Sequence, residues 1–236
     1  MCLSNTQQHP PKRDAPLRPG MGTGAWTWLL VGLALGVPAA LAGWVPLDHT
    51  DSAWPAWARS WALHPDQGWT GLSPQALWTC AWLHGSATHL YKNLAALLLL
   101  IPFGISLRVD ARAALAWLLA WPLTHIGMLN QPLHTYIGMS GALHSGAIII
   151  ALNVVLGTLS APTSSSMPID RHQKISAWIL LIGLILKIIM ENPWQHVLIR
   201  SMASDINVAP WAHLSGAVAG AALYISLRLL PSRRRV

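Results

Sequence analysis

The sequence predicts an all-α polytopic membrane protein with six transmembrane helices and both termini in the cytoplasm. Of its 236 residues, 53% are hydrophobic and only 10% are charged, whereas soluble domains carry roughly 25% charged residues. The apolar segments are about 20 residues long, which suits a helix that crosses a bilayer and exceeds the length of a barrel strand. Because the bilayer core offers no hydrogen-bond partner to a bare amide, spans of this length are expected to be helical.

Six apolar segments are long enough to cross the membrane. The first is too long for a signal-peptide core and no small-residue cleavage site follows it, so we expect a retained anchor. The third is the least regular, because Pro122 and His125 interrupt it. The predicted spans are residues 25–46, 86–107, 111–130, 140–160, 174–191 and 209–230.

Basic residues indicate the orientation of these spans, since cytoplasmic segments carry an excess of Lys and Arg. With the N-terminus inside, the inner segments contain Lys12, Arg13, Arg18, Arg108, Arg112, Arg171, Lys174, Arg228, Arg233, Arg234 and Arg235. The outer segments contain fewer, namely Arg59, Lys92, Lys187 and Arg200. Attraction to anionic lipids of the inner leaflet accounts for the net charge of +7, and no nucleic-acid partner is expected.

Residues 25–230 are predicted to form one membrane domain between two basic cytoplasmic tails, residues 1–24 and 231–236. The first tail is rich in Pro, Gly and basic residues, which favours flexibility. The outer loop, residues 48–85, carries several tryptophans, and this side chain prefers the headgroup level of a membrane. Two roles for the loop remain open, namely interfacial anchoring and the gating of substrate access.

Ser140 lies where a loop gives way to the fourth span, between Gly138 and Gly141. Glycines permit unusual backbone dihedral angles and close approach. The first amides of a helix lack intrahelical partners, so they are suited to hold a developing oxyanion at the positive end of the helix. Ser140 is therefore a candidate nucleophile, and a helix-capping role is the simpler alternative.

His213 opens the sixth span and shares one helical face with Gly216 and Gly220. Small residues permit close helix packing, and packing of this face on Gly141 would bring the imidazole to Ser140. An ionisable residue at membrane depth indicates function, although a hydrogen bond that serves packing alone is the alternative. No Asp or Glu is expected near His213, so the predicted mechanism uses a dyad rather than a triad.

Two further pairs stand at the outer ends of spans. His89 and Asn93 are four residues apart in the second span, so they project together and both can donate hydrogen bonds to an oxyanion. Snorkelling of polar side chains toward the interface is the alternative. Lys187 and Glu191 have the same spacing in the fifth span, and we expect a structural role, in which they pair with each other or steady the loop before the sixth span.

The motifs resemble those of the rhomboid intramembrane serine proteases. Three of them occur in the family's order, namely His89-x-x-x-Asn93, Gly138-x-Ser140-Gly141 and Ala212-His213-x-x-Gly216-x-x-x-Gly220. The resemblance covers residues 25–230 and implies a six-helix rhomboid-like bundle. It implies Ser140 as the nucleophile and His213 as the general base. It also implies an oxyanion hole formed by His89, Asn93 and the backbone amides of Met139 and Ser140.

Finer features resemble the rhombosortase branch. These are His144 after the serine, the Leu- and Ala-rich run after Asn93, and the Val-Ala-Pro-x-Ala-His lead into the sixth span. The resemblance implies a multi-pass enzyme of a bacterial inner membrane with its active site facing the periplasm. The implied substrates are surface or secreted proteins with a GlyGly-CTERM tail, which combines a short glycine motif, one transmembrane helix and basic residues. Membrane lipids are the other expected partners.

Two readings compete with a protease. The first is a catalytically inactive rhomboid-like protein that binds membrane clients, which the intact serine and histidine disfavour. The second is a haem or metal carrier that uses His84, His89, His144 and His213, since histidines on separate spans can clamp such a group. The glycines after His213 leave little room for a macrocycle. Cys2 and Cys80 have no metal-binding spacing, and no cofactor or metal is expected.

Overall fold

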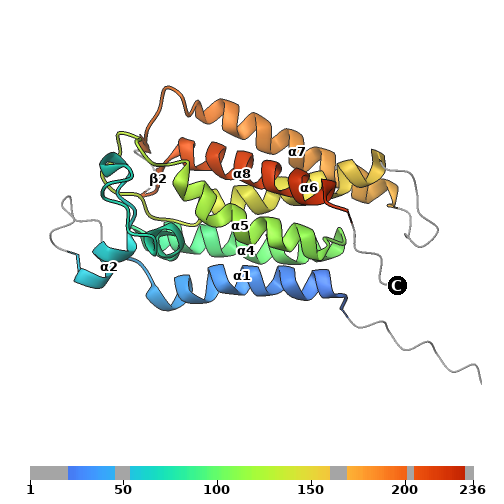
Figure 1. The fold of residues 1–236 in the computed structure, drawn as a ribbon, viewed down its shortest axis with the longest axis horizontal. Helices are drawn as coiled ribbons and strands as arrows, with labels where there is room; N and C mark the ends of the chain where they lie inside the picture. Colours follow the sequence, from blue (N-terminus) through green and yellow to red (C-terminus); the bar gives the residue numbers. More distant parts are fainter. Residues whose placement is uncertain (1–20, 46–53, 160–168, 201–204, 232–236) are drawn as a thin grey trace, which may run out of the picture.

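The long helices of the protein lie side by side, and short elements gather at one end of the bundle (Figure 1). The computed structural model describes residues 21–45, 54–159, 169–200 and 205–231. The long helices are α1 (Thr23–Ala42), α4 (Ala87–Ser106), α5 (Ala111–Ile126), α6 (Ser140–Leu159), α7 (Arg171–Glu191) and α8 (Pro210–Leu229). The short elements are α2 (Ala56–Trp61), η2 (Pro65–Gln67), α3 (Ala76–Thr79), η3 (Cys80–Trp82), β1 (Ile199–Arg200) and β2 (Asn207–Val208).

Each long helix falls on one of the predicted apolar segments. Four of them, α1, α4, α6 and α7, are long and apolar enough to cross a membrane, so the chain is a multi-pass membrane protein. Helix α5 ends at Ile126, four residues before the predicted boundary. The chain then continues through turns to Asn130, which takes a positive φ of 66° and whose amide donates to the Pro65 carbonyl over 2.8 Å. A contact with the loop before α4 thus holds the chain four residues after the helix ends.

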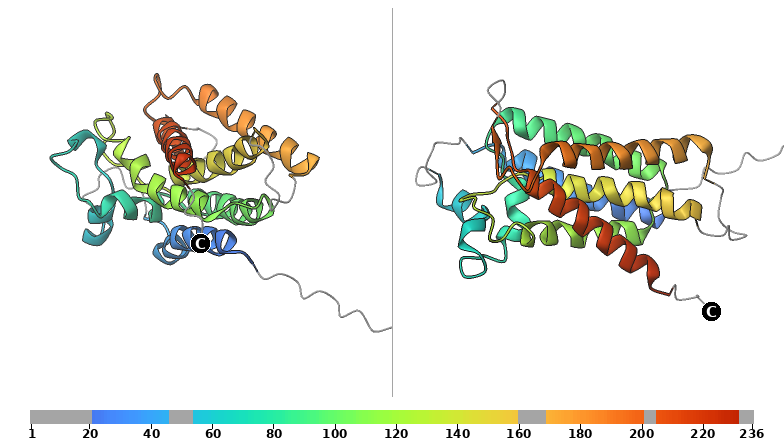
Figure 2. Two further views of the ribbon diagram at one scale, coloured as in Figure 1. Left: turned by 45° about the vertical axis from the view of Figure 1, so that its right-hand side comes forward. Right: turned by 90° about the horizontal axis from the view of Figure 1, so that it is seen from above.

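Helix α6 is the centre of the bundle. It packs against α5, α7 and α8, and also contacts α4, as the two further views make visible (Figure 2). The start of α1 and the end of α8 lie at the same end of the bundle, opposite α2 and the sheet (Figure 1). The predicted tails fall mainly on residues 1–20 and 232–236, which lie outside the described residues.

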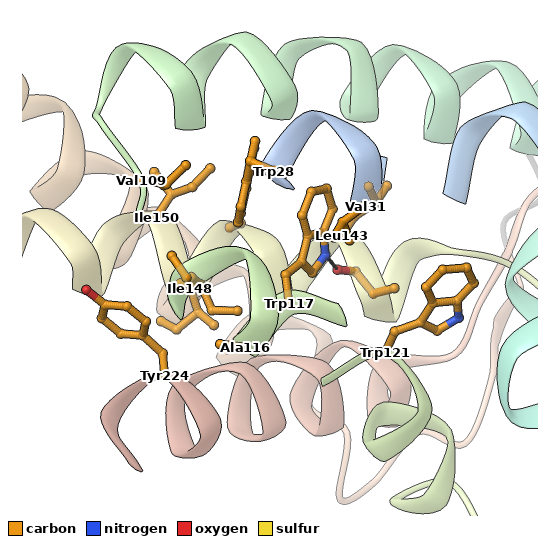
Figure 3. Close-up of a cluster of buried hydrophobic side chains, with 14 of the residues drawn as sticks. Trp28, Val31, Val109, Ala116, Trp117, Trp121, Leu143, Ile148, Ile150 and Tyr224 are labelled. Atoms are coloured by element: carbon orange, nitrogen blue, oxygen red, sulfur yellow. Dashed lines mark hydrogen bonds between the residues drawn. The ribbon is translucent and has the colours of Figure 1, made fainter. Parts of the chain in front are cut away.

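Aromatic side chains fix α6 against its neighbours in the core (Figure 3). The rings of Trp28 in α1 and Trp117 in α5 have centroids 4.2 Å apart, and both side chains are fully buried. The indole N–H of Trp117 donates to the Ala142 carbonyl of α6 over 2.8 Å. This bond joins the core to the first turn of α6, two residues after Ser140.

The described part of the tryptophan-rich loop, residues 54–85, packs on the bundle. It forms short helices, of which α3 packs on α5 and η3 packs on α1. The indole of Trp82 donates to the Ala34 carbonyl over 3.0 Å, and that of Trp121 donates to the Trp78 carbonyl over 3.1 Å. Trp57 and Trp69 remain exposed. The described part of the loop therefore combines packing on the long helices with two exposed tryptophans.

Candidate active site

Ser140 is presented by a constrained turn at the start of α6. Gly138 has a φ of 121°, which side chains rarely adopt. Its amide donates to the Cys80 carbonyl over 2.9 Å, and its carbonyl accepts from the Tyr136 hydroxyl over 3.1 Å. A Cβ on Gly138 would lie 2.9 Å from Cε1 of His89. Glycine is therefore required here for both the backbone conformation and the approach of His89.

Close packing of α8 on α6 brings His213 to Ser140. A Cβ on Gly216 would lie 2.0 Å from the Gly141 carbonyl oxygen, and one on Gly220 would lie 2.7 Å from the Ser145 carbonyl oxygen. The two helix backbones are thus in contact along the small-residue face that contains His213. The imidazole Nε2 lies 3.0 Å from the Ser140 Oγ, and the His213 ring is buried. This is hydrogen-bond geometry between a hydroxyl and a potential base.

The prediction that no Asp or Glu lies near His213 is wrong. Glu191 is the last residue of α7, and its Oε2 lies 2.6 Å from Nδ1 of His213. The predicted pair with Lys187 is also present, because Lys187 Nζ donates to the other carboxylate oxygen. The sequence places Glu191 and His213 at the same outer depth, and this shared depth was the signal that could have revealed the contact. The intrahelical pairing with Lys187 concealed it.

His144 stacks on the face of the His213 ring. The two imidazoles stack with centroids 3.9 Å apart and an interplanar angle of 13°. His144 Nδ1 is 2.7 Å from the Ser140 carbonyl oxygen, one turn earlier in α6, so Nδ1 carries the hydrogen and donates. His144 therefore limits the tilt of the His213 ring and ties its own position to the backbone of Ser140.

His89 and Asn93 occupy different positions relative to Ser140. His89 lines the same cavity as Ser140, whereas Asn93 is buried and does not line it. The Asn93 Nδ2 lies 3.0 Å from Nε2 of His84, and His84 Nδ1 lies 3.3 Å from the Trp82 carbonyl oxygen. The carbonyl requires the hydrogen on Nδ1, so Nε2 of His84 accepts from the amide of Asn93.

His84 is a functional candidate that the sequence motifs did not single out beyond the metal alternative. Burial, with a smaller effect from the charge of His89, lowers the pKa of His84 from 6.5 to about 3. A neutral His84 thus holds one hydrogen of the Asn93 amide and leaves the other available. Among the described residues, no three His, Cys, Asp or Glu side chains are grouped to hold a metal ion.

A cavity of about 1070 Å³ opens in front of Ser140 at this end of the bundle. Its walls come from the outer loop, the start of α4, the segment before α6, and the sheet. They are both polar and apolar, with Trp54, Tyr136 and Arg200 among the lining residues. Trp54 is buried and comes from the predicted interfacial loop. The cavity is large enough for a short stretch of unwound peptide.

Family comparison agrees with this geometry. The Rhomboid domain model matches residues 66–229, which include every residue of the site described above except Trp54. The chain belongs to the rhomboid family. No curated protein and no solved structure matches it. Rhomboid proteins form a family of intramembrane serine proteases, and the hydroxyl–imidazole pair at the start of two apolar helices is the chemistry that such a protease needs.

Proposed function

We propose that this rhomboid protein is an active intramembrane serine protease in which Ser140 is the nucleophile and His213 the general base. The observation that carries the proposal is the 3.0 Å contact between Nε2 of His213 and the Ser140 Oγ beneath an open cavity. His213 removes the hydroxyl proton, the Oγ attacks the scissile carbonyl, and the carbonyl π electrons move to its oxygen. The C–N bond then breaks as the imidazolium of His213 gives its proton to the leaving amine, which leaves an acyl-enzyme. His213 takes a proton from the water that attacks this ester and returns it to the Ser140 Oγ as the acid product departs.

The developing oxyanion is held by side chains of α4 and by the start of α6. His89 and the free hydrogen of the Asn93 amide are the side-chain donors, and the backbone amides of Met139 and Ser140 complete the oxyanion hole. The orientation of Asn93 by His84 and the closeness of His89 to Gly138 support this assignment. Fixed donors in a water-poor site stabilise charge far better than donors in water.

The same arrangement supports a proposal for the membrane topology. We infer six spans within residues 25–230, with α5 and α8 crossing the bilayer beside the four more apolar helices, and cytoplasmic tails at residues 1–24 and 231–236. The placement of the chain's two helical ends at one end of the bundle supports a common side for both termini (Figure 1). The excess of basic residues assigns that side to the cytoplasm, so the active site faces the periplasm of a bacterial inner membrane.

For the substrate we propose the GlyGly-CTERM class, which the likeness to rhombosortases indicates. Such tails place small, flexible residues just outside a single transmembrane helix. Unwinding at glycines is cheap in a helix, and a short unwound peptide suits the volume of the cavity. The enzyme would cut near or within the C-terminal transmembrane segment and release a shortened product.

Coexpression with a GlyGly-CTERM client tests the proposal. Wild-type protein is expected to release the shortened client, and Ser140→Ala is expected to abolish release while leaving folding unchanged. A client in which the glycine pair is replaced by leucine serves as the matched control and should be cut less. Equal release by the Ser140→Ala protein would refute the assignment of the nucleophile.

A catalytically inactive client-binding protein is the second candidate. It shares the fold and differs in the chemistry at Ser140. A serine-reactive fluorophosphonate probe separates the two, because the protease is expected to label at Ser140 and the inactive protein is not.

A visible absorption spectrum of the purified protein addresses the haem alternative, since a haem-bound protein absorbs strongly in that range.

A further inference from the structure

The carboxylate of Glu191 makes two different contacts at the outer end of α7. Its Oε2 lies 2.6 Å from Nδ1 of His213, and its Oε1 accepts from Nζ of Lys187. The Glu191 side chain is 14% exposed and the His213 side chain 5% exposed, whereas the Lys187 side chain is 48% exposed. The carboxylate is therefore turned toward the buried imidazole, and the ammonium group faces outward.

This contact determines which nitrogen of His213 carries the hydrogen. A carboxylate accepts hydrogen bonds and donates none, so the short contact requires the hydrogen on Nδ1. Nε2 is then left with its lone pair directed at the Ser140 hydroxyl, 3.0 Å away. That is the tautomer a general base needs, and the opposite tautomer could not accept the serine proton.

We propose that Glu191 is the positioning residue of a Ser140–His213–Glu191 triad, an inference that rests on the proposed protease function. When the Ser140 O–H bond breaks, the proton moves to Nε2 of His213 and the Oγ bonds to the substrate carbonyl carbon. The hydrogen on Nδ1 stays in place. Glu191 keeps its negative charge throughout and stabilises the imidazolium that forms. It touches no substrate atom and acts through His213 alone.

A structural role for the Lys187–Glu191 pair would not require this geometry. A pair four residues apart on a helix is satisfied on the helix surface, and exposed pairs of this kind add little stability. Here the chain bends away directly after Glu191, where Asn192 takes a left-handed φ of 48°. Helix α7 thus ends with its final side chain turned onto α8.

Several charged or titratable groups face His213 from the surrounding helices. Lys187 and Glu191 come from α7, His144 stacks on the ring from α6, and His89 of α4 lines the cavity in front of Ser140. Glu191 is the acidic group among them that contacts the imidazole. The negative charge of Glu191 favours the imidazolium, whereas the positive charge of Lys187 opposes it. Removing the Glu191 charge should therefore lower the pH midpoint of labelling, and removing the Lys187 charge should raise it.

The test uses the rate at which a fluorophosphonate probe labels Ser140 in the purified full-length protein, measured across the pH range 5 to 9. We expect Glu191→Gln to slow labelling roughly 10²-fold or more, since the wrong tautomer of the base becomes populated. The pH midpoint of the remaining labelling should fall by about one unit, because the imidazolium loses its stabilising charge. Glu191→Asp should recover part of the rate.

Lys187→Gln is the matched control. This substitution removes the Lys187 ammonium that pairs with Glu191 and leaves the Glu191–His213 contact in place. It should change the labelling rate only a few-fold and move the pH midpoint slightly upward. Labelling of Glu191→Gln at the wild-type rate with an unchanged midpoint overturns the triad and leaves the protease assignment intact. A wild-type protein that neither labels at Ser140 nor cuts the client overturns both. If thermal unfolding shows that Glu191→Gln does not fold, the other two variants decide the matter. A slower rate for Glu191→Asp with an upward midpoint for Lys187→Gln supports the triad, and wild-type rates and midpoints for both overturn it.

Discussion

Helices α6 and α7 both contribute to the site, but the bundle holds them very differently. In the apolar segment of α6, 67% of the residues are buried, whereas in that of α7 only 17% are buried. Helix α6 carries Ser140 and contacts helices on several sides, while α7 packs mainly on α6 and reaches α8 near its end. The nucleophile is therefore fixed by dense packing. The carboxylate that touches its base comes from a helix that faces mostly outward.

Glycine substitutions at the α6–α8 interface and in α7 should show this difference in packing most clearly. In Gly216→Ala, the new Cβ would lie 2.0 Å from the Gly141 carbonyl oxygen, so α8 must move away from α6 and take His213 with it. We expect a loss of about 1–3 kcal/mol in the free energy of unfolding and no detectable client cleavage. Thermal unfolding in detergent and the cleavage assay measure the two effects.

Gly183→Ala in α7 is the matched control for that substitution. No atom lies within 4 Å of its added Cβ, and alanine favours a helix over glycine by about 1 kcal/mol. This variant should keep its activity and unfold at the wild-type temperature or above. Equal damage from the two substitutions would contradict the difference in packing between α6 and α7.

The oxyanion donors of α4 should give the next largest effect. Loss of one such donor typically lowers turnover by roughly 10²–10³-fold, and we expect Asn93→Ala to fall in this range with KM little changed. His84→Ala should cause a smaller loss, because it only releases the Asn93 amide from its orienting contact. The double variant should be no worse than Asn93→Ala alone. Additive losses would show that His84 acts independently of Asn93.

The core bond onto α6 should matter less for activity and more for stability. Trp117→Phe removes the indole N–H that donates to the Ala142 carbonyl while keeping an aromatic ring. We expect a cost of about 1 kcal/mol for the bond, with an added loss from the smaller ring. Thermal unfolding measures it, and Trp57→Phe on the exposed face of the outer loop is the control. An unchanged unfolding temperature for Trp117→Phe would argue that the core does not hold this turn.

The smallest effect is expected on the outward face of α7. Met190 is 83% exposed although it directly precedes Glu191, and exposed substitutions usually change stability by less than about 0.5 kcal/mol. Met190→Ala should therefore match the wild type in unfolding temperature and in client cleavage. A clear loss of cleavage would mean that this face of α7 contacts the substrate.

The sequence predicted the long helices because the membrane makes length and apolarity decisive. It also placed Ser140, His213 and the small-residue face of α8 in one region, since the glycine spacing forces that face into contact. It missed Glu191, because a local partner, Lys187, already explained that charge. The early end of α5 and the folding of the outer loop were missed for another reason. Both depend on contacts between distant segments, such as Asn130 with Pro65, which no local pattern encodes.

The polar attachments of α7 lie at its two tips. Near its start, the Gln173 side chain donates to the Ser106 carbonyl at the end of α4 over 3.0 Å, and at its finish Glu191 meets His213. Between these tips much of the helix is exposed, as lipid-facing surface would be. A hydrophobic stretch that does not match bilayer thickness responds by tilting, and tilt about the Gln173 end of α7 would displace the Glu191 end. The acyl-chain length of the surrounding lipids should therefore alter, through this tilt, the contact between Glu191 and the imidazole of His213.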